Sequence, residues 1–385
     1  MNAAQNSPIS LSDLPADSGV LICGHGSRAK IAEQEFGLLA AGLRRQYPSV
    51  KIEYGFLEYS APNLHMALDR LIEQGVKNIY AVPGMLFRAT HAQNDIPSVL
   101  TTYAEKHKDL TITYGRELGL HDEMIAAFEM RILEALGLKE TPKPGSLYDT
   151  MLVVVGRGTS VAAANAEAAK LCRIVTENLG FGWAETVYSG VTFPSVGVGL
   201  EMASKLGFKR VIVAPYFLFS GRLIDRIYGY VDKVAAEHPE IEYLKADYLK
   251  DNDHVINTFA YRIEELVNNT SGEKNLLIDF KERLARGEID VHHHHAEFKP
   301  SHDHGHDHGH DHGHDHGHGH GHGHRHHHAP YRHIAHPLGP RTMIDENVCC
   351  CFMGQFPESV IEEERELRKR NGILATERTP LCKKS

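Results

Sequence analysis

Short apolar runs alternate with amphipathic segments along the first 270 residues of the chain. In the first cycle, residues 19–23 form an apolar run, residues 29–45 carry apolar side chains at helical spacing, and Tyr47-Pro48 ends this predicted helix. The alternation predicts strands at residues 19–23, 51–57, 78–82, 110–114, 151–155, 185–191, 210–213 and 241–248. It predicts helices at residues 29–45, 63–74, 95–106 and 122–136, and others that begin near residues 162, 194, 223 and 252. Such an order is typical of a mostly parallel sheet covered on both faces, which places ligands at the carboxyl ends of its strands.

The second group of elements repeats the first at an offset of 132 residues. Residues 22–27 (ICGHGS) align with residues 154–159 (VVGRGT), and residues 82–87 (VPGMLF) align with residues 214–219 (APYFLF), without a gap. We therefore predict an α/β protein of two tandem homologous, doubly wound parallel-sheet domains followed by a disordered His-rich tail. The predicted segments are an N-terminal extension (1–17), a first half with the active site (18–137), a linker (138–149), a second half with a degenerate site (150–268), a connecting helix (269–290), a His-rich tract (291–340) and a Cys-containing segment (341–385).

Three side chains with metal or proton chemistry are present in the first copy and missing from the second. His25 aligns with Arg157, Glu58 with Gly190 and His91 with Leu223. Because each of the three follows the end of a predicted strand, we expect them at one edge of the first sheet. Imidazoles and a carboxylate suit a divalent ion such as Co²⁺, Ni²⁺, Zn²⁺ or Fe²⁺. Taken singly, His25 is more simply interpreted as a helix cap and His91 as a residue of a solvated loop. The loss of all three residues together from the second copy favours a functional site instead.

Composition limits the class of protein. A chain of 385 residues with 42% hydrophobic and 24% charged residues can bury two cores and carry a tail. Its apolar runs are shorter than the roughly 20 residues that cross a bilayer, and the N-terminus lacks a signal-peptide pattern. A net charge of −9 without a basic stripe disfavours nucleic acid as a partner. Six cysteines without a disulfide framework indicate a reducing cytoplasm. Two fused halves are compatible with a monomer.

A His-rich tract follows the second half. Residues 292–295 and 302–328 hold 19 of the 28 histidines, many in His-Asp-His-Gly repeats. This composition cannot build a packed core, and its imidazoles favour low-affinity binding of several divalent ions, for storage or delivery. An expression tag is the simple alternative, which the internal position and the Asp and Gly pattern disfavour. The predicted low-affinity ligands include His302, His304, His306, His308, His310 and His312.

Several of these motifs also carry a family resemblance. Gly24-His25-Gly26-Ser27-Arg28, the stretch from Phe56 to Pro62, and the loop from Pro83 to His91 with Asp95-Ile96-Pro97 resemble the class II tetrapyrrole chelatases. Residues 18–268 are most similar to the long form of sirohydrochlorin cobaltochelatase, the CbiX type, in which a His-rich segment after the second half is also typical. The resemblance implies insertion of Co²⁺ into sirohydrochlorin, or its factor II form, during cobalamin biosynthesis.

Roles for the individual residues follow from this activity. His25 and His91 are expected to hold the metal, while Glu58 accepts pyrrole protons or serves as a third ligand. Sirohydrochlorin carries many carboxylates, so Ser27 with its neighbouring backbone N–H groups, Arg28 and Arg88 are expected to bind them. Arg157 cannot ligate a metal but can pair with a carboxylate; a surface arginine left after decay of the site is the equal alternative.

The final cysteines depart from the family pattern. Some long-form relatives carry an iron–sulfur motif here, whereas this chain has three adjacent cysteines and one far along the sequence. A cluster held by Cys349, Cys351 and Cys382 competes with soft-metal binding and with redox sensing.

Other functions remain open at this stage. A ferrochelatase or a nickel chelatase would use the same residues. A non-enzymatic metal store would need only the tail, and gives no reason for His25, Glu58 and His91. A histidine phosphatase is disfavoured because Gly24 stands where that class has an arginine.

Overall fold

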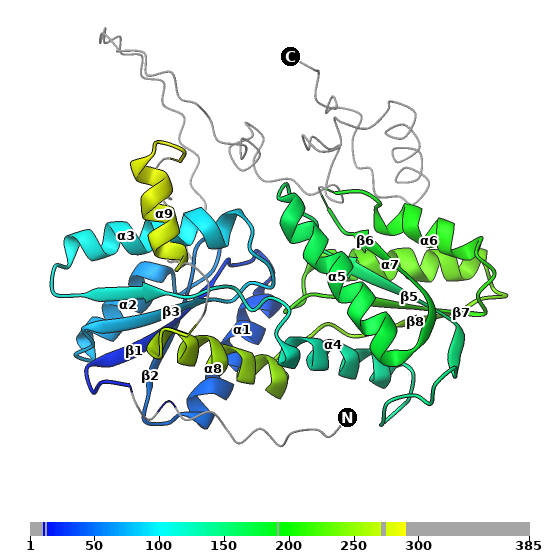
Figure 1. The fold of residues 1–385 in the computed structure, drawn as a ribbon, viewed down its shortest axis with the longest axis horizontal. Coiled ribbons are helices and arrows are strands. Elements are labelled where there is room, and N and C mark those ends of the chain that lie inside the picture. The colour runs from blue at the N-terminus through cyan, green and yellow to red at the C-terminus, as the bar shows by residue number, and fades with distance from the viewer. Residues whose placement is uncertain (1–10, 12–13, 191, 271–274, 290–385) are drawn as a thin grey trace, which may run out of the picture.

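Two separate four-stranded parallel sheets form the frame of the molecule (Figure 1). The computed structural model describes residues 11, 14–190, 192–270 and 275–289. The first sheet has the order β2-β1-β3-β4, and its strands are β1 (Ser18–Gly24), β2 (Lys51–Phe56), β3 (Asn78–Pro83) and β4 (Thr111–Tyr114). The second has the order β6-β5-β7-β8, with β5 (Leu147–Gly156), β6 (Phe181–Tyr188), β7 (Arg210–Pro215) and β8 (Glu242–Lys245). The predicted fold of two tandem parallel-sheet α/β domains is confirmed.

Helices cover both faces of each sheet. The outer face of the first sheet packs against α2 (Leu64–Glu73) and α3 (Ile96–Lys106), and that of the second against α6 (Val196–Ser204) and α7 (Arg222–Glu237). The inner faces pack against α1 (Lys30–Gln46) and α5 (Ala162–Leu179). Every residue of β1 is buried, as expected for a central parallel strand with helices on both sides.

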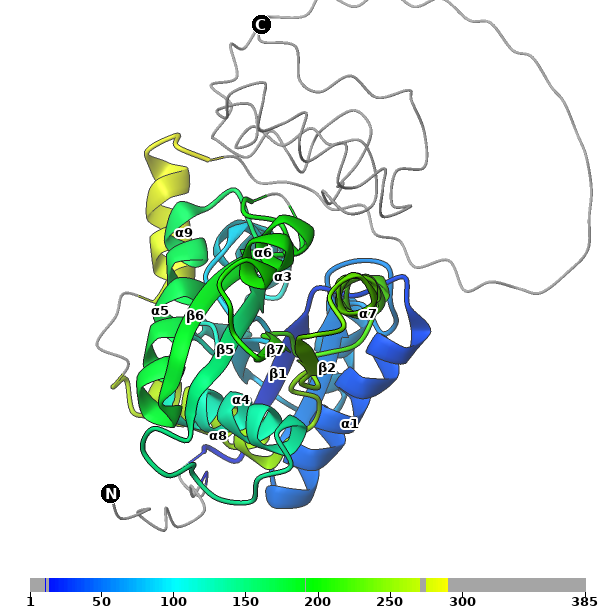
Figure 2. The same cartoon turned by 90° about the vertical axis from the view of Figure 1, so that its right-hand side faces the viewer.

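The last helix of each sequence half crosses to the sheet of the other half. α4 (Asp122–Ala135) follows β4 in sequence but packs on α5 and β7, whereas α8 (Asp253–Val267) follows β8 but packs on β3 and α1. Figure 1 shows α8 beneath the first sheet and α4 beneath the second, and Figure 2 shows the two helices side by side. One inner core therefore contains apolar residues of both halves, including Phe36, Phe128, Leu171 and Phe259.

Several element boundaries differ from the sequence-based expectation. β6 spans Phe181–Tyr188 instead of residues 185–191, and β8 spans Glu242–Lys245 instead of residues 241–248. β5 begins at Leu147, inside the predicted linker, and pairs there with Phe181 of β6 before a bulge. The exposed polar surface of Tyr148 and Asp149 hid this strand start, because it breaks the buried apolar pattern. The expectation that His91 lies in a loop is also wrong, since residues His91–Asp95 form a π-helical turn, η1, that leads into α3.

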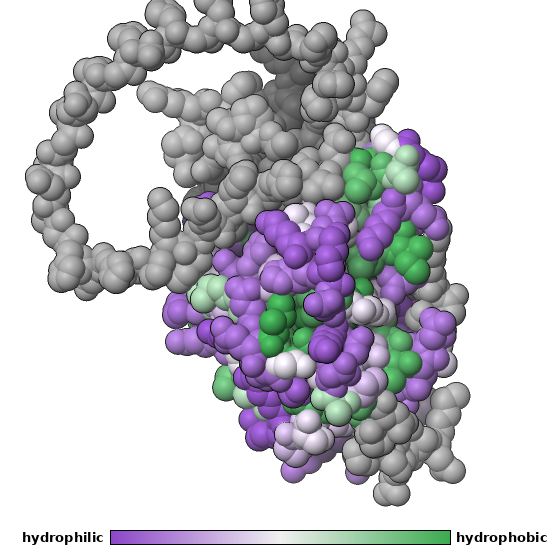
Figure 3. Space-filling model, turned by 90° about the vertical axis from the view of Figure 1, so that its left-hand side faces the viewer, coloured by the Kyte–Doolittle hydropathy of each residue, from purple (hydrophilic) through white to green (hydrophobic). Residues whose placement is uncertain are grey.

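Within the described residues, no helix is long and apolar enough to cross a membrane. Figure 3 views the first half from the side that faces away from the second half. Hydrophilic residues predominate on this face, and hydrophobic residues form small separate areas among them. The helices on this side bury their apolar residues against the sheet.

Replacing Phe259 of α8 by Ala tests the shared inner core. The side chain is fully buried, so its loss should lower the free energy of unfolding by about 3–5 kcal/mol. Trp183, the single tryptophan, lies in β6 of the second half and reports on its unfolding by fluorescence. Because the core joins both halves, the urea midpoint of this fluorescence should fall together with the midpoint seen by circular dichroism of the whole chain. Ile31→Ala, on the exposed side of α1, is the control and should cost less than about 0.5 kcal/mol. A Trp183 transition that keeps its native midpoint would contradict the shared core.

Candidate metal-holding site

His25, Glu58 and His91 meet at the carboxyl edge of the first sheet. His25 follows β1, Glu58 lies two residues after β2, and His91 opens η1 beyond β3. The Nε2 atom of His25 lies 2.9 Å from Nε2 of His91 and 3.3 Å from Oε1 of Glu58. The two imidazole planes are nearly perpendicular, at 75°. Three strand ends thus bring three metal-binding atoms to one place.

Hydrogen bonds at the far side of each ring determine which nitrogen faces the site. His25 Nδ1 lies 2.9 Å from the carbonyl oxygen of Gly26, and His91 Nδ1 lies 2.7 Å from Oδ2 of Asp95. Neither oxygen can donate, so each Nδ1 carries the proton. In the neutral rings both Nε2 lone pairs then point toward one another and toward the Glu58 carboxylate. A cation between these atoms satisfies all three, and buried Asp95 orients His91 as second-sphere carboxylates orient metal-binding histidines.

The electrostatic surroundings keep His25 neutral. Burial lowers the pKa of His25 well below its ordinary value, and the nearby His91 and Arg157 lower it further. A neutral imidazole is the form that binds a metal ion. The lowered pKa favours the neutral, ligand-competent form of His25.

Arg157 brings the second half to the same site. It follows β5, as His25 follows β1, and it interacts electrostatically with both His25 and Glu58. Arg157 is exposed to solvent, although loss of hydration by the surrounding protein lowers its pKa and the charge of Glu58 raises it. A permanent cation of the second half thus lies within electrostatic range of His25 and Glu58.

The separations from His25 to His91 and to Glu58 are close to those of neighbouring ligand atoms on a metal ion. A first-row ion with ligand distances of about 2.0–2.1 Å has neighbouring ligand atoms about 3 Å apart, close to the separations from His25 to His91 and to Glu58. Among the described residues, no group of three or more His, Cys, Asp and Glu side chains is arranged so that it could hold a metal ion as it stands. Two imidazoles with a carboxylate beside one of them leave most coordination positions open. Such a site can pass its ion to a stronger set of ligands.

A close backbone approach fixes His25 relative to Glu58. Gly26 has φ +95°, and a Cβ built on it would lie 1.7 Å from the carbonyl oxygen of Glu58. The Glu58 N–H donates to the carbonyl oxygen of His25 at 3.0 Å. Ser60 Oγ accepts from the Ser27 N–H and donates to the Ser27 carbonyl oxygen, each at 3.0 Å. The loops after β1 and β2 therefore form one unit.

The second half repeats this backbone without the metal-binding side chains. Gly158 has φ +80°, and a Cβ there would lie 2.1 Å from the carbonyl oxygen of Gly190. Thr192 Oγ1 donates to the Thr159 carbonyl oxygen at 3.0 Å, as Ser60 does to Ser27. The loop scaffold is retained, while His25, Glu58 and His91 are replaced.

The remaining predicted substrate-binding residues lie in different surroundings. The Ser27 N–H is already bonded to Ser60, and the Ser27 hydroxyl accepts from the Ala29 N–H. Arg28 is exposed, and its guanidinium lies 5.0 Å from the ring centre of Tyr59, which follows Glu58. Arg88 pairs with Asp279 at 3.3 Å. Carboxylate binding by these residues stays a prediction.

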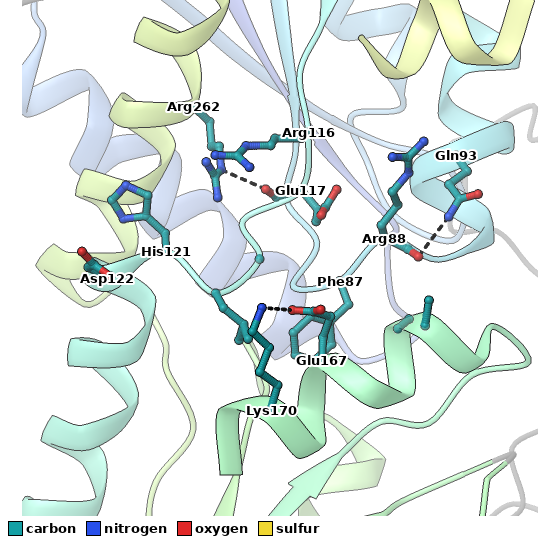
Figure 4. Close-up of a pocket in the computed structure, with 14 residues that line it drawn as sticks. Phe87, Arg88, Gln93, Arg116, Glu117, His121, Asp122, Glu167, Lys170 and Arg262 are labelled. Atoms are coloured by element: carbon teal, nitrogen blue, oxygen red, sulfur yellow. Dashed lines mark hydrogen bonds and ion pairs between the residues drawn. The ribbon is translucent and has the colours of Figure 1, made fainter. Parts of the chain in front are cut away.

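A polar cavity of about 570 Å³ lies between the two halves, on the Arg88 side of the site. Figure 4 shows Arg88 and Gln93 at one end, Glu167 and Lys170 of α5 at another, and Arg116 beside Arg262. Arg116 and Arg262 both pair with Glu265, so their charges are partly neutralised. His25, Glu58 and His91 are not among the lining residues.

Asp95 is the functional residue that the sequence interpretation missed. Its carboxylate is 3% exposed and lies four residues after His91. A His-x-x-x-Asp spacing on a helix would have indicated the pair, but His91 was expected in a loop, where that spacing has no meaning. The predicted tail ligands, His302 to His312, and the predicted cluster cysteines, Cys349, Cys351 and Cys382, lie outside the described residues.

The fold has two parallel-sheet halves, with two imidazoles and a carboxylate at the edge of the first sheet and Arg157 within electrostatic range of them. Comparison with known proteins identifies the family of this fold. The CbiX family model matches residues 19–135 and 151–266, more than half of the chain. The chain therefore belongs to the CbiX family.

Relatives with known names agree with this assignment. The chain is 35% identical over 248 residues to the sirohydrochlorin cobaltochelatase of Priestia megaterium, covering 64% of this chain and 79% of the relative. It is 25% identical over 257 residues to the sirohydrochlorin ferrochelatase of the same organism, covering 67% and 93%. The solved structure of SirB from Bacillus subtilis with Fe³⁺ is 26% identical, with a TM-score of 0.59, and covers 67% of this chain and 99% of that one.

Gly26→Ala should disturb the metal-holding site through the backbone. The substitution costs about 1–2 kcal/mol for the positive φ alone, and the added Cβ forces the Glu58 loop away. Gly207→Ala is the control, because Gly207 also has a positive φ, +79°, but lies in the turn after α6 with no atom within 4 Å of an added Cβ. Both variants should lose stability in urea, whereas metallation of sirohydrochlorin per folded molecule should fall much further for Gly26→Ala. Equal metallation by the two folded variants would show that this approach does not set the site geometry.

Proposed function

We propose that this chain inserts Co²⁺ into sirohydrochlorin, with His25 and His91 holding the ion and Glu58 accepting protons. The observation that carries the proposal is that the Nε2 atoms of His25 and His91 lie 2.9 Å apart beside the Glu58 carboxylate. The match of residues 19–135 and 151–266 to the CbiX family supports it. The similarity to a cobaltochelatase at 35% identity supports Co²⁺ as the substrate metal.

Insertion of a divalent ion releases the two pyrrole N–H protons of the macrocycle. The two imidazoles hold the ion while its open positions face the incoming pyrrole nitrogens. Glu58 Oε1, 3.3 Å from His25 Nε2, takes up one proton at a time and returns it to solvent, which reaches the carboxylate. Four macrocycle nitrogens form a stronger ligand set than two imidazoles, so the ion moves from protein to product.

Arg157 orients the macrocycle in this proposal. Its cation lies within electrostatic reach of the site but cannot ligate the metal. An arginine guanidinium can form two parallel hydrogen bonds to a peripheral carboxylate of sirohydrochlorin, and the exposure of Arg157 leaves it accessible to one. The second half thus supplies orientation, and the first half supplies the ligands and the proton acceptor.

Fe²⁺ is the second candidate metal. The chain also resembles sirohydrochlorin ferrochelatases at 25% and 27% identity, over 67% and 66% of its length. Imidazole and carboxylate ligands accept Fe²⁺, Co²⁺ and Ni²⁺ alike, so the ligand set leaves the choice open. Metallation rates for each ion at equal free concentration decide it.

Metallation of sirohydrochlorin, followed by its absorption change, tests the site. His25→Ala and His91→Ala should each slow the reaction by about 100-fold or more, because each removes a ligand, and Glu58→Gln should slow it by removing the proton acceptor. His238→Ala, which loses only a surface contact to Glu240, is the control and should react at the native rate.

Native rates for both His25→Ala and His91→Ala would refute the site. Metal uptake by the chain without any metallation of sirohydrochlorin would favour a storage protein instead.

Truncation after Ile289 tests the proposed role of the His-rich tract. We propose that the tract buffers or delivers metal and takes no part in insertion. The truncated chain should therefore metallate sirohydrochlorin at the native rate with saturating Co²⁺ and fall below it when Co²⁺ is scarce. Replacing the tract by a Gly/Ser segment of equal length separates the histidines from chain length. A large loss at saturating Co²⁺ would show that the tract acts in insertion itself.

A further inference from the structure

The last described helix, α9 (Leu276–Ala285), folds back onto the element that carries His91. It lies beyond the two segments that match the family, yet it contacts α3, η1 and β4 of the first half (Figure 1). Leu276 and Leu277 are buried in the outer core of the first half, and Phe280 is fully buried. This apolar face anchors α9 and turns its charged face toward η1.

Arg283 on that charged face binds η1 at two points. Its guanidinium donates to Asn94 Oδ1 at 2.8 Å and to the carbonyl oxygen of Gln93 at 2.9 Å. A third bond goes to Asp279 Oδ2 at 3.0 Å, one helical turn earlier on α9, which holds the guanidinium in place. Asn94 is buried, and its amide donates to the Thr90 carbonyl oxygen.

The sequence removes the donor that an α-helix would offer to the Gln93 carbonyl oxygen. In an α-helix the carbonyl oxygen of Gln93 would accept from the N–H of residue 97, but residue 97 is a proline and has no N–H. Arg283 supplies a donor to this carbonyl oxygen from another helix. The contact lies two residues from His91 and two from Asp95, the partner of the His91 ring.

Asp279 also links α9 to Arg88, in the chain just before η1. Its Oδ2 also accepts from Arg88 at 3.3 Å, and the Arg88 carbonyl oxygen accepts from the Gln93 side chain at 3.1 Å. Asp279 and Arg283 thus link α9 to the chain before and after His91. This pair and its contacts to Arg88, Gln93 and Asn94 are called the α9 brace below.

We propose that the α9 brace fixes the position of His91 relative to His25, with Arg283 as the positioning residue; this inference rests on the proposed function. The brace holds η1 so that both Nε2 atoms face one ion, and without it the turn shifts and the imidazoles separate. Arg283 touches neither metal nor macrocycle, and its effect on insertion passes through His91.

A double-mutant cycle on the full-length chain tests this role. At saturating Co²⁺ and sirohydrochlorin, Arg283→Met should lower kcat by about 10- to 100-fold, because a misplaced ligand costs that much, and leave KM for sirohydrochlorin unchanged. In the His91→Ala background the same substitution should cost less than about twofold, since its target is gone. Arg283→Lys, which can reach one acceptor at a time, should recover part of the rate.

Arg286→Met is the matched control. Arg286 lies on α9 three residues further on and pairs with Glu282 and Glu288 instead of η1, so the variant should keep the native rate. Equal losses from Arg283→Met with and without His91, or a native rate for Arg283→Met, would overturn the proposal.

Hydrogen exchange separates this inference from the proposed function. Arg283→Met should speed amide exchange in residues 90–96, and Arg286→Met should not. Faster exchange in a chain that never metallates sirohydrochlorin would support the brace and refute the proposed function. Unchanged exchange would refute the brace even if the native chain metallates sirohydrochlorin.

Discussion

The exchange of α4 and α8 between the two sheets is the constraint on which the rest of the structure depends. Each sheet has only part of its inner face covered by its own half, by α1 or α5, and takes the rest of the cover from a helix of the other half, so one core joins them. Because interiors are close-packed, this core holds the two carboxyl edges in a fixed relation. The electrostatic contact of Arg157 with His25 and Glu58 follows from that arrangement.

Within this frame, the chemistry depends on how protons are placed. Gly26 and Asp95 occupy the Nδ1 protons of the two histidines, which leaves two lone pairs and a carboxylate around one point. Such a group is unfavourable by itself and becomes favourable when a cation arrives. The unfavourable free energy of this grouping concerns only the side chains of His25, Glu58 and His91. The backbone geometry of the loops is the same in both halves.

The sequence predicted the fold class and the residues that share an edge, because both depend on the order of strands and on the repeat. His25, Glu58 and His91 follow successive strands, and parallel strands bring their ends together. Local patterns did not reveal the π-helical turn at His91, the partner role of Asp95 or the crossing of α4 and α8. Those features arise from tertiary packing, as when Arg283 donates to a carbonyl oxygen almost 200 residues earlier in the chain. The start of β5 at Leu147 was missed because Tyr148 and Asp149 are exposed.

The crossing of the helices also sets an order of events during synthesis. Domains generally begin to fold from the N-terminus as the chain emerges, but the part of the first sheet's inner face that α1 does not cover stays open until residues 253–267 of α8 have been made. α4, already complete, has no sheet to pack on until β7 exists. The edge that bears His25 and His91 therefore matures only late in translation. A chain that stops between the two halves leaves the ribosome as an unfinished domain and not as half of a working protein.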